Sequence, residues 1–319
     1  MKKAISLGFI QFLFMSLLAQ SQADTSIKAY NAVLKTPTGD IHGSITVPVA
    51  NERVPVVIII PGSGNTDRDG NSLLSDVRTN AYKILALHLA HNGIAALRFD
   101  KRGVGKSQTS GSQVSNVTFD DYVSDVMAWI AYLRQVDDFS DLIVLGHGEG
   151  ALVGMIAARR ARAGSFISLE GVGKPVDQIY RDVLQNYPPE LKKQSDIIID
   201  SLRAGYRAKG VSRELAGLLG PDVQPYLMSS MRYNPASEIA ALKMPVLIIH
   251  GRNDKQIPPE HASLLTIAKP NAKLVLIDKM NYVLKDASDD PKEAYKTFMN
   301  PDIPCNQEML DAVVGFIKQ

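Results

Sequence analysis

The chain has 319 residues, of which 45% are hydrophobic and 21% charged, a composition typical of a globular protein and not of a disordered, fibrous or multi-span membrane chain. Its 35 Lys and Arg residues nearly balance 33 Asp and Glu residues, so no basic excess indicates a nucleic-acid or anionic-membrane partner. The single cysteine, Cys305, excludes an intrachain disulfide, a CxxC redox pair and a multi-thiolate zinc site.

Residues 1–23 have the pattern of a signal peptide. Lys2 and Lys3 form a positive start, the run Ala4–Ala19 is almost wholly apolar, and Ser21–Ala23 supplies the small residues that a signal peptidase needs. The apolar run is shorter than the ~20 residues that span a bilayer. We expect cleavage before Asp24 and export to a periplasm or beyond, with no membrane attachment after cleavage.

Short apolar segments rich in β-branched residues recur along the rest of the chain. The first two, Asn31–Lys35 and Ile41–Pro48, alternate in polarity around Thr38–Asp40 and predict an antiparallel hairpin at a sheet edge. The later ones are apolar on both faces, as parallel strands covered by helices on both sides must be. These later segments are 56–60, 94–99, 142–145, 166–169, 246–249 and 274–277. The sequence therefore predicts an α/β fold with a mostly parallel twisted sheet.

The pattern changes between residues 176 and 242, which are amphipathic, helical in periodicity and rich in Lys, Arg and Tyr. Breaks fall at Pro188–Pro189 and Gly220–Pro221. We predict that 176–242 is a helical lid inserted between two parts of one core, 24–175 and 243–319, and that it covers the carboxyl edge of the sheet.

The segment Gly146–Gly150 (GHGEG) follows the apolar segment 142–145 and precedes a helical pattern that begins at Ala151. Loops at the carboxyl ends of parallel strands form the natural crevice of such a sheet. This setting is that of the nucleophile elbow, G-x-S-x-G, whose glycines let strand and helix approach while the central residue adopts a strained backbone. A generic tight turn is the alternative interpretation. The central residue here is Gly148, which has no side chain.

Together with this elbow, further segments resemble the α/β-hydrolase superfamily, and especially its exported esterase and serine-aminopeptidase-like branch, over nearly all of residues 31–318. Loop 61–70 (PGSGNTDRDG) resembles the loop after the third strand of that branch, and 100–107 (DKRGVGKS) its next strand-to-loop signature. Segment 250–258 (HGRNDKQIP) resembles the loop that carries the triad acid, and 280–284 (MNYVL) falls where the branch has Asn-His.

The resemblance implies a role for each matching residue. Gly148 stands at the nucleophile position, Asp254 at that of the triad acid and Tyr282 at that of the catalytic base, in the chain order of the superfamily. The backbone N–H groups of Ser63 and Glu149 would form the oxyanion hole.

Two triad members are therefore replaced. Gly148 offers no nucleophilic oxygen, and Tyr282, with an ordinary pKa of about 10, is a protonated donor near neutral pH. We expect the Tyr282 hydroxyl to hydrogen-bond Asp254. Without its triad a serine hydrolase retains only the ~10³ to 10⁴-fold catalysis of binding and oxyanion hole.

The sequence thus predicts a hydrolase-fold protein that does not hydrolyse esters or peptides and keeps a lidded pocket for a small-molecule acyl ester or peptide-like ligand. An inactivated variant of an esterase, or an esterase with an unconventional constellation, is the alternative.

The remaining candidates receive structural interpretations. We expect His147 to buttress the elbow, His250 to be packed and hydrogen-bonded, and His261 to be solvated. No pair of histidines has ligand spacing with a carboxylate, so we expect no metal and no cofactor. Residues 105–107 (GKS) match the end of a phosphate-binding loop, but Asp100 stands at its first glycine position and would repel phosphate.

Overall fold

A computed structural model describes residues 26–111 and 117–319. The expected signal peptide, 1–23, lies outside these residues. Within the described ranges, no helix has both the length and the apolar content of a bilayer-spanning segment.

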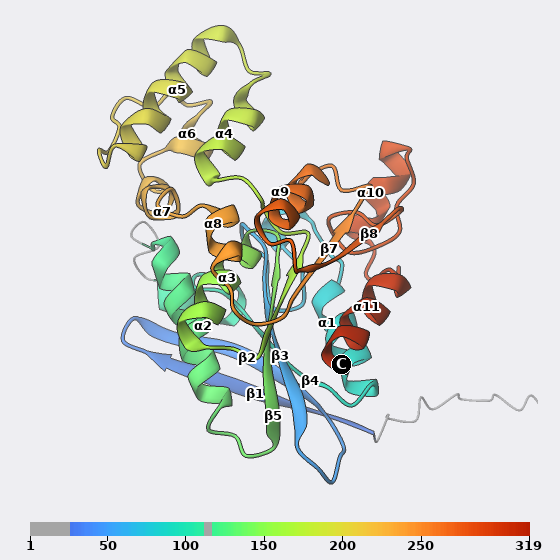
Figure 1. Cartoon of the computed structure of the whole chain (residues 1–319). Coiled ribbons are helices and arrows are strands. Elements are labelled where there is room, and N and C mark those ends of the chain that lie inside the picture. Colours follow the sequence, from blue (N-terminus) through green and yellow to red (C-terminus); the bar gives the residue numbers. More distant parts are fainter. Residues whose placement is uncertain (1–25, 112–116) are drawn as a thin grey trace, which may run out of the picture.

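A single eight-stranded sheet forms the centre of the described part of the chain (Figure 1). Its strand order is β1-β2-β4-β3-β5-β6-β7-β8. The strands are β1 (Ile27–Thr36), β2 (Gly39–Pro48), β3 (Val54–Ile60), β4 (Ala95–Phe99), β5 (Phe139–His147), β6 (Ser165–Leu169), β7 (Val246–Gly251) and β8 (Lys273–Ile277). The pairs β1–β2 and β2–β4 are antiparallel and the other neighbouring pairs are parallel. The predicted α/β fold and its edge hairpin are confirmed.

Helices cover both faces of this sheet (Figure 1). They are α1 (Ala81–His91), α2 (Phe119–Leu133), α3 (Glu149–Ala161), α9 (Glu260–Ala268) and α11 (Gln307–Ile317). Helix α10 (Pro291–Met299) and the 3-10 turns η1 (Leu73–Ser75) and η2 (Gly105–Gly111) lie in the connecting segments. In β3, Val56, Ile58 and Ile60 join the buried cluster under α2 and α3, whereas Val57 and Ile59 join the cluster under α1 and α11. Because side chains alternate along a strand, burial on both faces requires this unbroken apolar run.

Residues 176–242 are largely helical, as the sequence predicts. Their helices are α4 (Val176–Leu184), α5 (Pro189–Arg203), α6 (Ala216–Leu219), α7 (Gln224–Ser230) and α8 (Pro235–Ala240). Helices α4 to α7 project from the body at the upper left of Figure 1 and enclose an apolar cluster of their own, which includes Ile199, Leu202 and Leu227. Helix α8 instead contributes Ile239 to the core beneath α3. The projection is anchored through α7, where Ser229 Oγ accepts the Phe119 backbone N–H at 2.7 Å.

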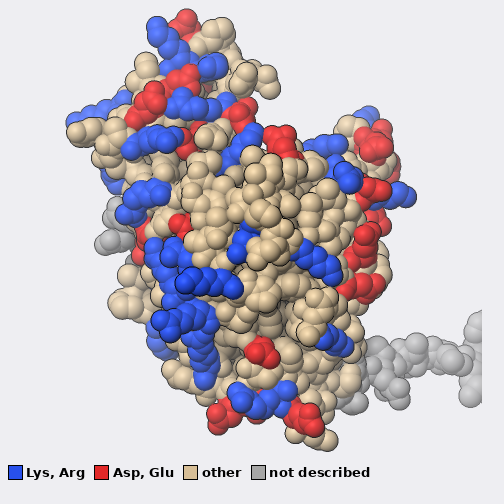
Figure 2. All heavy atoms as spheres, viewed as in Figure 1, with Lys and Arg blue, Asp and Glu red and all other residues tan. Residues whose placement is uncertain are grey.

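The view in Figure 2 shows charges of both signs on this projection and a group of Lys and Arg residues over the side where α2 and α3 lie. Part of the positive charge beside these helices is neutralised within the chain. Arg159 pairs with Glu238 at 2.8 Å, and Arg232 pairs with Asp120.

Candidate functional site

The turn at Gly148 joins β5 to α3 with φ 56° and ψ −121°, a backbone conformation that glycine adopts more readily than any other residue. The flanking glycines are needed for close packing. A Cβ at Gly146 would lie 2.3 Å from the carbonyl oxygen of Gly150, and a Cβ at Gly150 would lie 2.5 Å from that of Pro61. The turn therefore has the tight strand-to-helix geometry expected of an elbow.

The hydroxyl of Tyr282 occupies the space over this elbow. A Cβ at Gly148 would lie 2.7 Å from Tyr282 Oη, and one at Gly62 would lie 2.5 Å from the same oxygen. Burial raises the pKa of Tyr282 well above its ordinary value, and the negative charges of Asp254 and Glu149 add to this rise. The hydroxyl thus stays protonated at the place where a nucleophile's side chain would stand.

The expected contact between Tyr282 and Asp254 is absent from the described residues. The hydrogen-bond partner of the Tyr282 side chain is Ser63, whereas the side-chain partner of Asp254 is Glu170. Asp254 Oδ1 accepts the backbone N–H groups of Gln256 at 2.7 Å and Ile257 at 3.0 Å. The prediction was wrong because a phenol reaches further than an imidazole, and the Tyr282 hydroxyl lies at the elbow, beside Gly148 and Gly62.

His147 links the elbow to the Tyr282 loop. The Tyr82 hydroxyl accepts the Gly62 N–H at 3.1 Å. Its own proton is therefore free to be donated to His147 Nδ1, which lies 2.7 Å away. The remaining ring nitrogen, Nε2, donates to the carbonyl oxygen of Tyr282 at 2.8 Å. Burial lowers the pKa of His147 to about 4, so the ring is neutral near pH 7. Both nitrogens are committed, and His147 acts as the buttress that the sequence indicates.

The oxyanion-hole donors remain a prediction. Neither the Ser63 N–H nor the Glu149 N–H donates to another backbone group in the described chain, and Glu149 is the first residue of α3, where helical N–H groups lack intrahelical partners. Both groups therefore have no backbone acceptor in the described chain.

Lys101, which sequence reasoning missed, fixes the loop that carries Ser63. Its ammonium donates to the carbonyl oxygen of Gly62 and lies 5.7 Å from the centre of the Tyr122 ring. Burial lowers the pKa of Lys101 to about 8, while the nearby Glu149 carboxylate opposes this change. The motif at 100–107 contained the signal, since Lys101 follows an apolar strand by only two residues and a lysine buried there must find a partner.

A cavity of about 260 Å³ opens beside the elbow. Tyr282 and His147 form one part of its wall, and no Asp, Glu, Lys or Arg lines it. Its hydroxyl and amide groups come mainly from Ser63, Asn65, Thr66, Thr79 and Gln256. Because His147 is neutral, the cavity presents hydrogen-bonding groups without a formal charge.

The predicted lid does not cover this cavity. None of its lining residues belongs to the segment 176–242. That segment instead contributes Tyr226 to a smaller cavity of about 20 Å³, which Lys101 and Glu149 also line. The projection departs after β6 and returns along α2 and α3, so it stands on the opposite side from the loop that carries Tyr282.

Two other histidines are buried. His250 Nε2 donates to the Ile257 carbonyl at 2.7 Å, consistent with the packed role expected for it. His261 is only 5% exposed, and its Nδ1 accepts the Gly173 N–H at 2.8 Å. The expectation that His261 is solvated was wrong, because α9 turns this side chain toward the loop after β6.

Glu170, which follows β6 directly, was also missed. It is fully buried, its Oε2 lies 3.1 Å from His250 Nε2, and its backbone has φ 49°. Burial raises the pKa of Glu170 well above its ordinary value, and the neighbouring carboxylate of Asp254 raises it further. A charged residue at the end of an apolar strand was the available signal.

Known hydrolases have sequences similar to that of this chain. The family described as serine aminopeptidase, S33, matches residues 78–171. A curated relative, esterase EstD of Thermotoga maritima, is 24% identical over 253 residues, which are 76% of this chain and 58% of the relative. The chain thus spans less than two thirds of that relative's length.

Solved structures share the fold. Est1E of Butyrivibrio proteoclasticus with bound ferulic acid superposes with a TM-score of 0.56 at 19% identity, covering 90% of this chain and 96% of that one. The α/β hydrolase GrgF of a Penicillium species gives a TM-score of 0.59 at 15% identity, covering 91% and 98%. The chain thus has the fold of these α/β hydrolases and is similar in sequence to the serine aminopeptidase family and to an esterase.

Proposed function

We propose that this protein of α/β-hydrolase fold binds a small uncharged ligand with an acyl ester or peptide-like carbonyl and does not hydrolyse it. The observation that carries the proposal is the Tyr282 hydroxyl, which lies 2.7 Å from the place of a Cβ at Gly148. Acyl transfer needs a nucleophilic oxygen there and a base beside it. This chain has a protonated phenol at that place.

The lining of the 260 Å³ cavity supports an uncharged ligand. A charged group taken out of water needs a partner of opposite charge, and this wall has none. Ser63 lines this cavity and would offer its N–H group to a carbonyl oxygen, and the hydroxyl-rich wall suits further neutral polar groups. The second expected donor, the N–H group of Glu149, belongs to a residue that lines the smaller cavity instead.

The alternative is an esterase with an unconventional constellation, as the esterase relatives would suggest. Two features speak against it. Both nitrogens of His147 are engaged in hydrogen bonds, and its lowered pKa of about 4 makes it a weak base. Glu170, His250 and Asp254 are buried and line neither cavity.

Hydrolysis is tested with p-nitrophenyl acetate, p-nitrophenyl butyrate and a fluorophosphonate probe. We expect no covalent labelling and ester turnover no faster than that of Tyr282→Phe, which removes the hydroxyl but keeps the ring. Stoichiometric labelling of any serine, or turnover near the ~10 s⁻¹ typical of enzymes, would contradict the proposal.

Binding is tested by saturation-transfer NMR with two neutral probes, ethyl butyrate and N-acetylalanine methylamide, against butyrate and butylammonium. We expect transfer to the neutral probes only. Val77→Trp, which fills the cavity, should abolish it, whereas Val183→Trp on the exposed face of α4 should not. Equal transfer to all four probes, or no effect of Val77→Trp, would refute the assignment of the cavity.

The proposed site of action is outside the cytoplasm, on the strength of the pattern in residues 1–23. Mass spectrometry of the chain from a periplasmic extract should show a new start at Asp24. A chain that keeps Lys2 and Lys3 in the cytoplasmic fraction would contradict export.

A further inference from the structure

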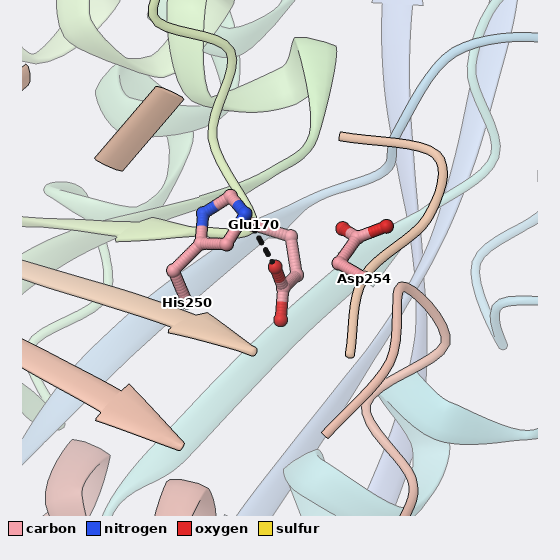
Figure 3. A group of neighbouring side chains, drawn as sticks. All are labelled: Glu170, His250 and Asp254. Atoms are coloured by element: carbon pink, nitrogen blue, oxygen red, sulfur yellow. Dashed lines mark ion pairs between the residues drawn. The ribbon is translucent and has the colours of Figure 1, made fainter. Parts of the chain in front are cut away.

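Three buried side chains meet behind the elbow, where β6 and β7 end. Glu170 follows β6, His250 lies near the end of β7, and Asp254 lies in the loop after it (Figure 3). One ligand atom from each lies within 4.8 Å of the other two. The exposed fractions are 0% for Glu170 and His250 and 1% for Asp254, so the group is enclosed by protein.

No described Lys or Arg forms an ion pair with either carboxyl group, and the charge of Lys255 acts on Asp254 only as a minor effect that opposes the rise of its pKa. The ion-pair partner of Glu170 is His250, and Asp254 forms no ion pair with any described Lys, Arg or His. Two carboxylates buried together without a positive charge are strongly disfavoured by desolvation and mutual repulsion. Some positive charge must therefore enter the group, either as a proton or as a metal ion.

The backbone holds each carboxyl group by one oxygen and leaves the other open. Glu170 Oε1 accepts the Gly251 N–H at 2.7 Å, and Asp254 Oδ1 accepts two further N–H groups. No other described group donates to Glu170 Oε2 or Asp254 Oδ2, and the two carboxyl groups lie within hydrogen-bond reach of each other, so that one proton could join them. Nδ1 of His250 also lacks a hydrogen-bond partner in the described chain. Hydrogen bonds of this kind, which orient a ligand through its second oxygen, are typical of the surroundings of metal ions.

We propose that Glu170, His250 and Asp254 bind a divalent transition-metal ion, with Zn²⁺ as the best match. One imidazole nitrogen and two carboxylate oxygens are a donor set that suits zinc, whereas Mg²⁺ and Ca²⁺ require six or more oxygens and usually keep water. The 3.1 Å between His250 Nε2 and Glu170 Oε2 is close to the about 3.4 Å that separates neighbouring ligands of a tetrahedral zinc ion.

The ion would act as a structural link. It would tie the end of β6 to the end of β7 and to the following loop, and it would bind Nε2 in exchange for that atom's hydrogen bond to the Ile257 carbonyl. None of the three ligands lines either of the two cavities beside the elbow, so the ion would not meet the ligand of the 260 Å³ cavity. The presence or absence of zinc would therefore leave the proposed function of the cavity unchanged.

The experiment measures bound metal on the purified full chain. The chain is incubated with ZnCl₂, dialysed against metal-free buffer and analysed by inductively coupled plasma mass spectrometry. We expect one zinc per chain for the parent and for the control Glu214→Gln, an exposed carboxyl on the projection. Glu170→Gln, which keeps the shape and the Oε1 contact, should lose the zinc.

A second measurement covers the case in which Glu170→Gln does not fold. Zn²⁺ should raise the thermal midpoint of the parent by several degrees, and a chelator should reverse this, whereas Mg²⁺ should have no effect. Zinc at background level in the parent with an unchanged midpoint would overturn the proposal, as would equal zinc in a folded Glu170→Gln. In either case a proton shared by Glu170 and Asp254 neutralises the group.

Discussion

The replacement Gly148→Ser places a side chain where the Tyr282 hydroxyl now lies. The serine would have to keep φ 56° and ψ −121°, a strained conformation that costs about 1–3 kcal/mol. Its Cβ would also lie 2.7 Å from Tyr282 Oη and 3.2 Å from Cε2, an overpacking that costs about 1–3 kcal/mol more. We therefore expect Gly148→Ser to lower the free energy of unfolding by about 2–6 kcal/mol in total.

The companion change Tyr282→His removes the atom responsible for the clash. An imidazole ends before the position of Oη, so only the backbone strain should remain when both changes are combined. The double variant should recover about 1–3 kcal/mol relative to the sum of the single effects.

Urea unfolding of the four chains measures these values, with the fluorescence of Trp129, the single buried tryptophan, as the probe. A Gly148→Ser chain as stable as its parent would refute the placement of the Tyr282 ring over the elbow. Strictly additive effects would show that the two residues do not touch.

The remaining predictions concern activity, packing and pH. Only the double variant Gly148→Ser/Tyr282→His should hydrolyse p-nitrophenyl butyrate above background, because serine and imidazole act as a unit; activity in either single variant would argue against this. Gly150→Ala, whose Cβ would meet a backbone carbonyl oxygen at 2.5 Å, should cost about 3 kcal/mol in urea unfolding, whereas Gly217→Ala, with no atom within 4 Å, should cost nothing. Burial lowers the pKa of His147 from 6.5 in the unfolded chain to about 4 in the folded chain. As the pH falls from 6.5 to 4, the unfolded chain therefore binds the proton before the folded chain does, and the free energy of unfolding falls by about 3 kcal/mol because of this residue. His147→Gln should make that fall in unfolding free energy shallower between pH 6.5 and 4, and an unchanged slope would contradict the assignment.

Much of the framework follows from local sequence. Apolar runs on both faces predict parallel strands, and the alternation around Thr38–Asp40 predicts the edge hairpin, because side-chain periodicity depends only on the geometry of the strand itself. The glycines at 146–150 predict the tight turn for a similar reason, since backbone freedom and the absence of a Cβ are properties of the residues themselves. Gly148 could thus be recognised as the elbow centre without any knowledge of its neighbours.

What surrounds the elbow was decided by tertiary structure. The sequence put Tyr282 at the position of a base and paired it with Asp254, but the reach of a phenol and the spacing of two loops place its hydroxyl beside Gly148 and Gly62. The projection 176–242 was identified as helical, yet the side on which it stands depends on where α7 anchors it.

Glu170 shows the same limit most clearly. It is separated by many residues from His250 and Asp254, and each of the three taken alone is an ordinary strand-end residue. They meet because the register of β6 against β7, from Phe166 opposite Val246 to Leu169 opposite Ile249, brings the ends of the two strands to one level. Periodicity predicts that each strand exists, but the alignment of one strand with another is fixed only by hydrogen bonds and packing between segments far apart in the chain.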